Sequence, residues 1–204
     1  MKLHILAALL IGTTAPLLLA TPQIVIGDLK LQRANLADDT GDQVREYIPA
    51  GETLDHWNRL ASVRILKKEK DSKKYLTRVA DEVKQSNPAA SSRFFQNDKK
   101  QTVLDFITFA PAESPVKYAE WNLMRAHYVK GSGLVVFQYA LRLYRINADS
   151  INLIVAEREK MMGPFVEATF DEKDDGIIPS RPDLETNVER LAPEGWESPE
   201  RKID

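Results

Sequence analysis

Histidine is the side chain that most often serves both metal binding and proton transfer, and this chain of 204 residues has three, His4, His56 and His127. None has metal-ligand spacing, because the sequence has no His-Glu-x-x-His pair and no twelve-residue calcium loop. The chain also has no cysteine, which excludes thiol catalysis, iron–sulfur clusters and Cys-ligated zinc. The sequence therefore predicts no metal site.

Hydrolytic chemistry remains an alternative, although no catalytic residue is assigned. No Gly-x-Ser-x-Gly elbow is present, so a Ser–His–acid triad would depend on tertiary structure to position a histidine. Asp105 and Glu120 fall on expected strands and could form a carboxylate pair for glycoside chemistry, if their separation in space allows it. The groups from which a hydrolase site could be built are Glu52, His56, Glu120 and His127.

Nucleotide binding is not expected. The nine glycines form neither a Gly-x-Gly-x-x-Gly fingerprint nor a Walker loop. The expected elements also lack the alternating strand–helix–strand units in which such sites lie. We therefore expect no cofactor.

Aromatic and arginine side chains on the expected strands are the better candidates for binding. Alternation along residues 139–145 places Tyr139 and Leu141 on one face of a strand, and Arg142 and Tyr144 on the other. An exposed Arg–Tyr face could hold a sugar or an anion by stacking and bidentate contacts, although ordinary cross-strand pairing explains the pattern as well. The candidate ligand-binding residues are Trp57, Trp121, Arg142 and Tyr144.

The N-terminus has the pattern of a secretory signal peptide over residues 1–20. Lys2 supplies a short positive start, an apolar stretch runs from Leu3 to Ala20, and Ala20 offers a small residue for cleavage before Thr21. An uncleaved membrane anchor is the alternative, but the stretch is slightly short and is interrupted by Gly, Thr and Pro. We expect an exported protein, periplasmic or secreted, that has no membrane contact after cleavage.

The first half of the mature chain reads as two strands followed by two helices. Strands are expected over residues 24–31 and 43–48. Thr53 is a suitable N-cap for a helix over residues 54–61, and residues 63–65 could form a short strand or the last helical turn. A clearer helix opens at Asp71 or Ser72 and ends at Asn87-Pro88.

The second half reads as four strands and a helix. The strands are expected over residues 93–97, 102–109, 117–129 and 134–146, with a hairpin turn at residues 130–133. A final helix starts at residues 148–150 and stops near Gly163-Pro164. The order β-β-α-α-β-β-β-β-α predicts an α+β fold, an antiparallel sheet of about five to six strands flanked by helices.

The C-terminal residues 171–204 differ from the single α+β domain expected over residues 21–170. They hold eleven acids, five bases and four prolines, a composition that predicts a disordered acidic tail. Trp196 could dock on the domain or stay in solvent. The mature chain as a whole is nearly balanced in charge, so nucleic acid is not an expected partner.

Residues 46–54, Glu-Tyr-Ile-Pro-Ala-Gly-Glu-Thr-Leu, followed by Trp57, resemble a pattern in small exported bacterial proteins of unknown function. The element order is similar to the Mog1/PsbP-like α+β fold. The resemblance implies a non-catalytic accessory or binding role and carries over no catalytic residue.

Three functions follow as hypotheses. The first is a non-catalytic binding or accessory module for an unknown small ligand or exported protein, acting through a sheet face or a groove beside Trp57. The second is the secreted hydrolase. The third is an interaction factor that uses the acidic tail to contact a basic partner.

Overall fold

The computed structural model describes residues 23–39, 41–96, 101–171 and 176–178. The expected signal peptide, Trp196 and nearly all of the expected acidic tail lie outside the described residues.

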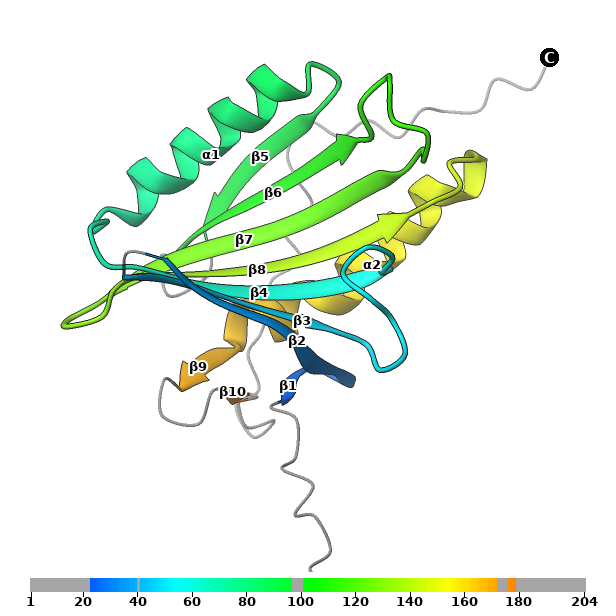
Figure 1. Ribbon diagram of the computed structural model, residues 1–204. Helices are drawn as coiled ribbons and strands as arrows, with labels where there is room; N and C mark the ends of the chain where they lie inside the picture. Colours follow the sequence, from blue (N-terminus) through cyan, green and yellow to red (C-terminus); the bar gives the residue numbers. More distant parts are fainter. Residues whose placement is uncertain (1–22, 40, 97–100, 172–175, 179–204) are drawn as a thin grey trace, which may run out of the picture.

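An eight-stranded antiparallel sheet forms the body of the protein, in the order β1-β2-β3-β4-β8-β7-β6-β5 (Figure 1). It is built from two meanders, each of four consecutive strands, which meet where β4 pairs with β8. The first comprises β1 (Gln23–Ile26), β2 (Leu29–Asp39), β3 (Asp42–Ile48) and β4 (Arg59–Leu66). The second comprises β5 (Ser91–Gln96), β6 (Thr102–Phe109), β7 (Ala119–Val129) and β8 (Gly133–Leu143).

Two helices cover opposite faces of the sheet. α1 (Ser72–Ser86) connects β4 to β5 and packs on β6 and β7 through Tyr75, Leu76 and Ala80. α2 (Ala148–Glu167) follows β8 and packs on the other face through Met161 and Phe165. Two short strands, β9 (Thr169–Asp171) and β10 (Gly176–Ile178), come last, and β10 lies against β1.

The alternation of side chains sends two different sets of residues to the two faces. The face under α2 carries the larger apolar cluster, which includes Tyr47, Trp121, Phe137 and Tyr139. The face under α1 carries a second apolar cluster where the helix covers it, and a small third cluster of Ile48, Trp57, Leu60 and Ala140 beside the β3–β4 connection. Polar side chains lie between these two clusters and lead to the candidate site.

Several expected elements are confirmed. The helix that opens with Asp71 as N-cap is α1, and its cap accepts a hydrogen bond from the Lys74 backbone nitrogen at 2.9 Å. β3 and β6 follow their predicted ranges closely, and the turn at residues 130–133 joins β7 to β8 as a hairpin.

The predicted fold class was wrong in sheet size and element order: the sheet has eight strands, and one helix, not two, separates the strand groups. The expected first strand is two strands, because Gly27, at φ 61°, makes a two-residue turn with Asp28. The expected helix over residues 54–61 is a turn closed by a bridge between Thr53 and His56, after which β4 begins. The last helix continues past Gly163-Pro164 to Glu167.

Candidate functional site

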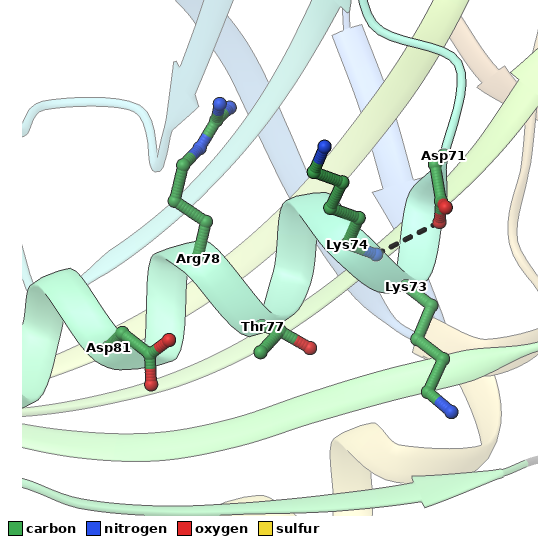
Figure 2. Close-up of a pocket in the computed structure, with 6 residues that line it drawn as sticks. All are labelled: Asp71, Lys73, Lys74, Thr77, Arg78 and Asp81. Atoms are coloured by element: carbon green, nitrogen blue, oxygen red, sulfur yellow. Dashed lines mark hydrogen bonds between the residues drawn. The ribbon is translucent and has the colours of Figure 1, made fainter.

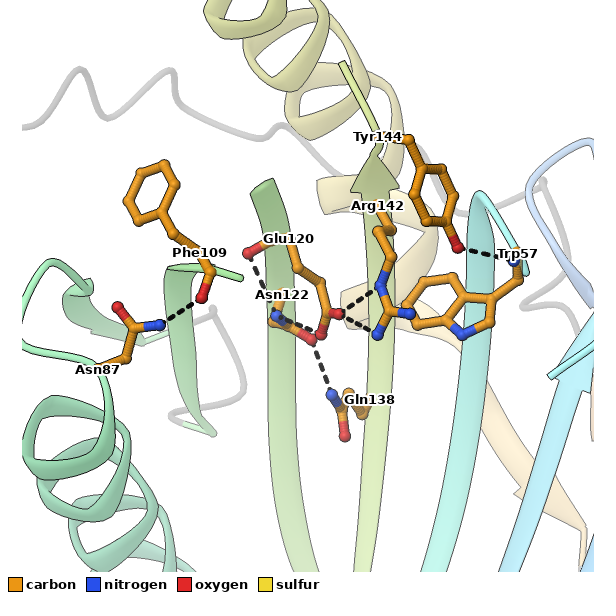
Figure 3. Close-up of polar contacts among 8 residues, drawn as sticks. All are labelled: Trp57, Asn87, Phe109, Glu120, Asn122, Gln138, Arg142 and Tyr144. Carbon is orange, nitrogen blue, oxygen red and sulfur yellow. Dashed lines mark hydrogen bonds and ion pairs between the residues drawn. The ribbon is translucent and has the colours of Figure 1, made fainter. Parts of the chain in front are cut away.

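Three connections meet at one end of the sheet, where β3, β6 and β8 finish and β4 and β7 begin. They are residues 49–58 between β3 and β4, residues 110–118 between β6 and β7, and residues 144–147 between β8 and α2. We call these three connections, together with the first two turns of α2, the loop end. Because β4, β8 and β7 are neighbours, side chains from three separate segments can touch here (Figure 3).

Arg142 lies at the centre of the loop end. Its register partner across the β7–β8 pair is Glu120, whose Oε2 accepts hydrogen bonds from Arg142 Nε at 2.9 Å and from a terminal nitrogen at 2.6 Å. The guanidinium also lies 4.0 Å from the Trp57 ring centroid and 4.4 Å from that of Tyr118. Burial acts to lower the pKa of Arg142, but the hydrogen bond and the negative charge of Glu120, together with Tyr144, outweigh it and the pKa is raised.

Tyr144 ties the β3–β4 connection to the end of β8. Its hydroxyl oxygen accepts a hydrogen bond from the Trp57 backbone nitrogen at 3.1 Å, and the His56 ring stacks on its ring at 4.2 Å. The Arg142 backbone nitrogen donates to the Asn58 carbonyl at 2.8 Å, and the Glu52 carboxylate accepts from the Asn58 backbone at 2.8 Å. The connection is therefore fixed at several points although it has no regular structure.

A chain of polar side chains leads away from Arg142 across the sheet. Asn122 donates to Glu120 Oε1 at 3.2 Å, Gln138 donates to Asn122 at 2.8 Å, and Arg64 donates to Gln138 at 3.3 Å. Asn122 is only 1% exposed, so these bonds satisfy groups that water cannot reach. The polar chain holds Glu120, and through it Arg142, in one position.

Exposed apolar side chains lie in the same connections and in the first turns of α2. Eight large apolar residues of the described chain are exposed to solvent, and five of them lie at the loop end. These five are Leu54, Val116, Ile146, Ile151 and Leu153. Apolar side chains concentrated at one end of a domain are typical of an interaction surface.

Two hollows in the described surface lie away from the loop end. One runs along the outer side of α1 and is lined by residues such as Lys73, Thr77 and Arg78 (Figure 2). The second lies beside it, between α1, β5 and β6. Neither of these two hollows is at the loop end.

Three of the four residues proposed from the sequence come together. Trp57, Arg142 and Tyr144 are in mutual contact, as described above. Trp121 lies on the opposite face, 2% exposed in the core under α2, where its Nε1 donates to Asp105 at 2.8 Å. Tyr118 was missed as a site residue: it lies directly before β7, and the pairing of β7 with β8 brings it beside Arg142.

The groups considered for hydrolysis are dispersed. His127 pairs with Val135 near the far end of β7, eight residues and roughly 26 Å from the strand start beside the loop end. Asp105 and Glu120 lie on opposite faces of the sheet, because Asp105 is in register with Leu123. Within the described residues, no group of three His, Asp or Glu could hold a metal ion.

The carboxylates under α2 hold that helix on the sheet. Asp105 accepts from Arg93 and from Arg158 of α2, each at 2.8 Å. Glu157 of α2 takes two hydrogen bonds from Arg59, at 2.8 and 2.9 Å, and a third from the Tyr139 hydroxyl. These contacts fix the middle of α2 on the sheet.

Comparison with known proteins gives one match. A protein-family model matches residues 22–170. No curated protein and no solved structure matches the chain, so the likeness to the Mog1/PsbP-like fold stays a prediction. Neither described helix combines the length and the apolar character that crossing a bilayer requires.

Proposed function

Since this chain belongs, through residues 22–170, to an uncharacterized protein family, we propose that it is an exported, non-catalytic binding module that docks a partner protein on its loop end.

The observation that carries this proposal is the fixed position of Arg142 between two aromatic rings, amid exposed apolar side chains. Tryptophan, tyrosine and arginine contribute most of the binding energy of many protein interfaces. Trp57 is only 5% exposed and supports Arg142 from within the domain. Tyr118 and Arg142 are partly exposed and already held in place by hydrogen bonds and stacking, so contact with a partner would cost little further side-chain entropy.

A partner protein suits this surface better than a small ligand. Small-molecule sites are concave and enclose most of the ligand, whereas the two hollows described above lie along α1 and not at the loop end. Exposed apolar side chains on the connections that carry a polar, aromatic centre are instead compatible with a broad protein contact.

The ionisable groups favour binding over hydrolysis. Glu120 is engaged by Arg142 and Asn122, and Glu52 by Asn58. His56 stacks on Tyr144, and among the described residues no carboxylate is bonded to its ring. A general base needs a free acceptor within hydrogen-bond reach of its substrate, and these carboxylates are already occupied.

Site-specific crosslinking in the native host tests the docking surface. A photoreactive amino acid replaces Leu54 or Ile151, and the matched control replaces Tyr128, which is 49% exposed at the other end of the sheet. We expect the same discrete adduct from both loop-end positions and none from Tyr128. The captured partner, once identified and purified, should bind the double variant Ile151→Glu, Leu153→Glu at least about tenfold more weakly.

Three results would contradict the proposal: no adduct, an equal adduct from Tyr128, or unchanged affinity of the double variant. Circular dichroism provides the folding control, and both substituted side chains are more than half exposed, so the fold should be retained.

Export is the second part of the proposal and rests on the sequence of residues 1–20. N-terminal sequencing of the mature protein should begin at Thr21, and the protein should leave the cell envelope without detergent. A mature protein that begins at Met1 and needs detergent for extraction would favour the membrane anchor instead.

A further inference from the structure

β5 forms one outer edge of the sheet. In the described part of the chain it pairs only with β6, so the backbone groups on its other side have no strand partner. The opposite edge differs, because β10 lies against β1. An unpaired edge offers hydrogen-bond donors and acceptors to another extended chain.

Natural proteins commonly protect such an edge with lysine, proline or a bulge, and β5 has none of these. Its sequence is Ser-Ser-Arg-Phe-Phe-Gln, and its register with β6 is continuous. The one charged side chain, Arg93, bonds Asp105, whereas Phe94 is 45% exposed. The edge is therefore accessible and partly apolar.

A hollow of about 280 Å³ lies beside this edge, on the face that α1 covers. α1 contributes Lys73 and Thr77, four residues apart on one side of the helix (Figure 2). The strands contribute Phe94, Gln96 and Thr102. α1 packs mainly on β6 and β7, and the hollow lies between the helix and the outer strands β5 and β6.

The charge around the edge is positive on both faces. On the α1 face, Lys73 is the only charged residue that lines the hollow. On the α2 face, two guanidinium groups, of Arg93 and Arg158, share the single carboxylate of Asp105 and leave one positive charge in excess. Arg93 and Arg158 are 43% and 29% exposed, so this charge is felt in solvent.

We propose that the free edge of β5 binds an extended acidic peptide of a partner protein as a ninth strand. Backbone hydrogen bonds to β5 hold the peptide. Alternate side chains of the peptide enter the hollow beside Lys73, and those between them face Arg93 and Arg158. This site is separate from the loop end, so the proposal does not depend on the function proposed there.

A second copy of the chain fits the same edge less well. Antiparallel pairing of β5 with its own copy would bring the two sets of Lys73, Arg93 and Arg158 together, and like charges facing each other destabilise a sheet pair. Charge complementarity therefore favours an acidic strand.

Peptide binding to the full chain tests the proposal. The probe is a fluorescently labelled peptide, Glu-Thr-Glu-Val-Glu-Thr-Glu-Val, followed by fluorescence anisotropy at low salt and by NMR of the protein amides. One control peptide has lysine for each glutamate, and a second has proline for each threonine and cannot complete the ladder. We expect saturable binding of the acidic peptide, at least about tenfold weaker binding of both controls, and amide shifts concentrated on residues 91–96.

Lys73→Glu should weaken binding of the acidic peptide roughly five- to tenfold, because it reverses one exposed charge. Lys130→Glu makes the same change in the β7–β8 turn and should alter the affinity by less than about twofold. Several results would overturn the proposal: no saturable binding, equal binding of the lysine or proline peptide, or shifts confined to the loop end. Light scattering that shows a dimer with shifted β5 amides would assign the edge to a second copy.

Discussion

Arg142 is held on three sides, by the Glu120 carboxylate and by the rings of Trp57 and Tyr118. The side chains of Arg142 and Glu120 are 19% and 16% exposed, so solvent screens their attraction only partly. The pair should therefore contribute more than an exposed ion pair on a helix.

A double-mutant cycle on this pair gives the first prediction. Glu120→Gln and Arg142→Met should each lower the free energy of unfolding by about 1–2 kcal/mol, because each leaves a half-buried partner unpaired. The loss of unfolding free energy in the double variant, measured by urea unfolding, should be smaller than the sum of the two single losses by about 1 kcal/mol.

The control is the pair Arg78–Glu82 on α1, 3.8 Å apart and 52% and 66% exposed. Its coupling should stay below about 0.5 kcal/mol. Equal coupling in the two pairs would mean that partial burial does not strengthen the Arg142–Glu120 contact.

The sequence could predict part of this site at the level of single residues. Alternation along β8 separates Arg142 from Tyr139 and Leu141, and the latter two do lie in the core under α2. Alternation could not show which face of β7 holds Trp121, because that depends on where α2 packs. Contacts of His56 and Tyr118 come from loops, which have no periodic pattern to read.

At the scale of elements, β4 shows why residues 54–61 were misread. Leu60, Ala61 and Val63 are all buried, because Leu60 clusters with Trp57 on one face of β4 and the other two lie in the core under α2 on the other face. A strand buried on both faces loses its alternation, and a short apolar run then resembles a helix segment. The helix α1 was predictable because its polar and apolar sides differ and its cap is explicit.

Gly133, where the β7–β8 hairpin enters β8, gives the second prediction. Its φ is +105°, and a Cβ there would lie 2.4 Å from the Leu66 carbonyl oxygen at the end of β4. Gly133→Ala should destabilise the protein by about 2–4 kcal/mol, since both the backbone and the neighbouring strand must shift.

Gly131 in the same turn is the matched control. Its φ is +97°, but a Cβ there would meet open space. Gly131→Ala should cost about 1 kcal/mol, from backbone strain alone. Thermal unfolding of the two variants checks the difference, and equal losses would refute the steric role of Gly133.

At the scale of the whole molecule, α2 is held to the sheet by charged groups as well as by its apolar side. Burial acts to raise the pKa of Glu157, but its hydrogen bonds to Arg59 and Tyr139 outweigh burial, and the pKa is lowered. A carboxyl whose pKa is lower in the folded protein than in the unfolded chain stabilises the fold at pH values above its pKa in the unfolded chain. That stabilisation is lost as the pH falls toward and through the pKa of the carboxyl in the folded protein.

The third prediction is therefore acid-dependent loosening of α2. The wild-type protein should lose stability as the pH falls below about 4.5, the ordinary pKa of this carboxyl. Glu157→Gln should be less stable at pH 7 and should lose less on acidification to pH 3.5. Urea midpoints at the two pH values measure both effects, and parallel losses in the two proteins would exclude Glu157 as a source.

The number of strands in the sheet could not be predicted from the sequence, because it depends on pairing between distant strands. Local patterns identify strands one at a time, but the joining of the two meanders depends on the pairing of Arg59 with Leu141, residues far apart in the chain. No pattern in the local sequence indicates such long-range pairing.

The pairing of β4 with β8 also has a consequence for how the chain folds during its synthesis. During synthesis the first meander can form its hairpins early, but the inner side of β4 stays unpaired until residues 134–143 have emerged. Distant pairing of this kind slows folding. A newly made chain therefore cannot complete its sheet until its final third is present.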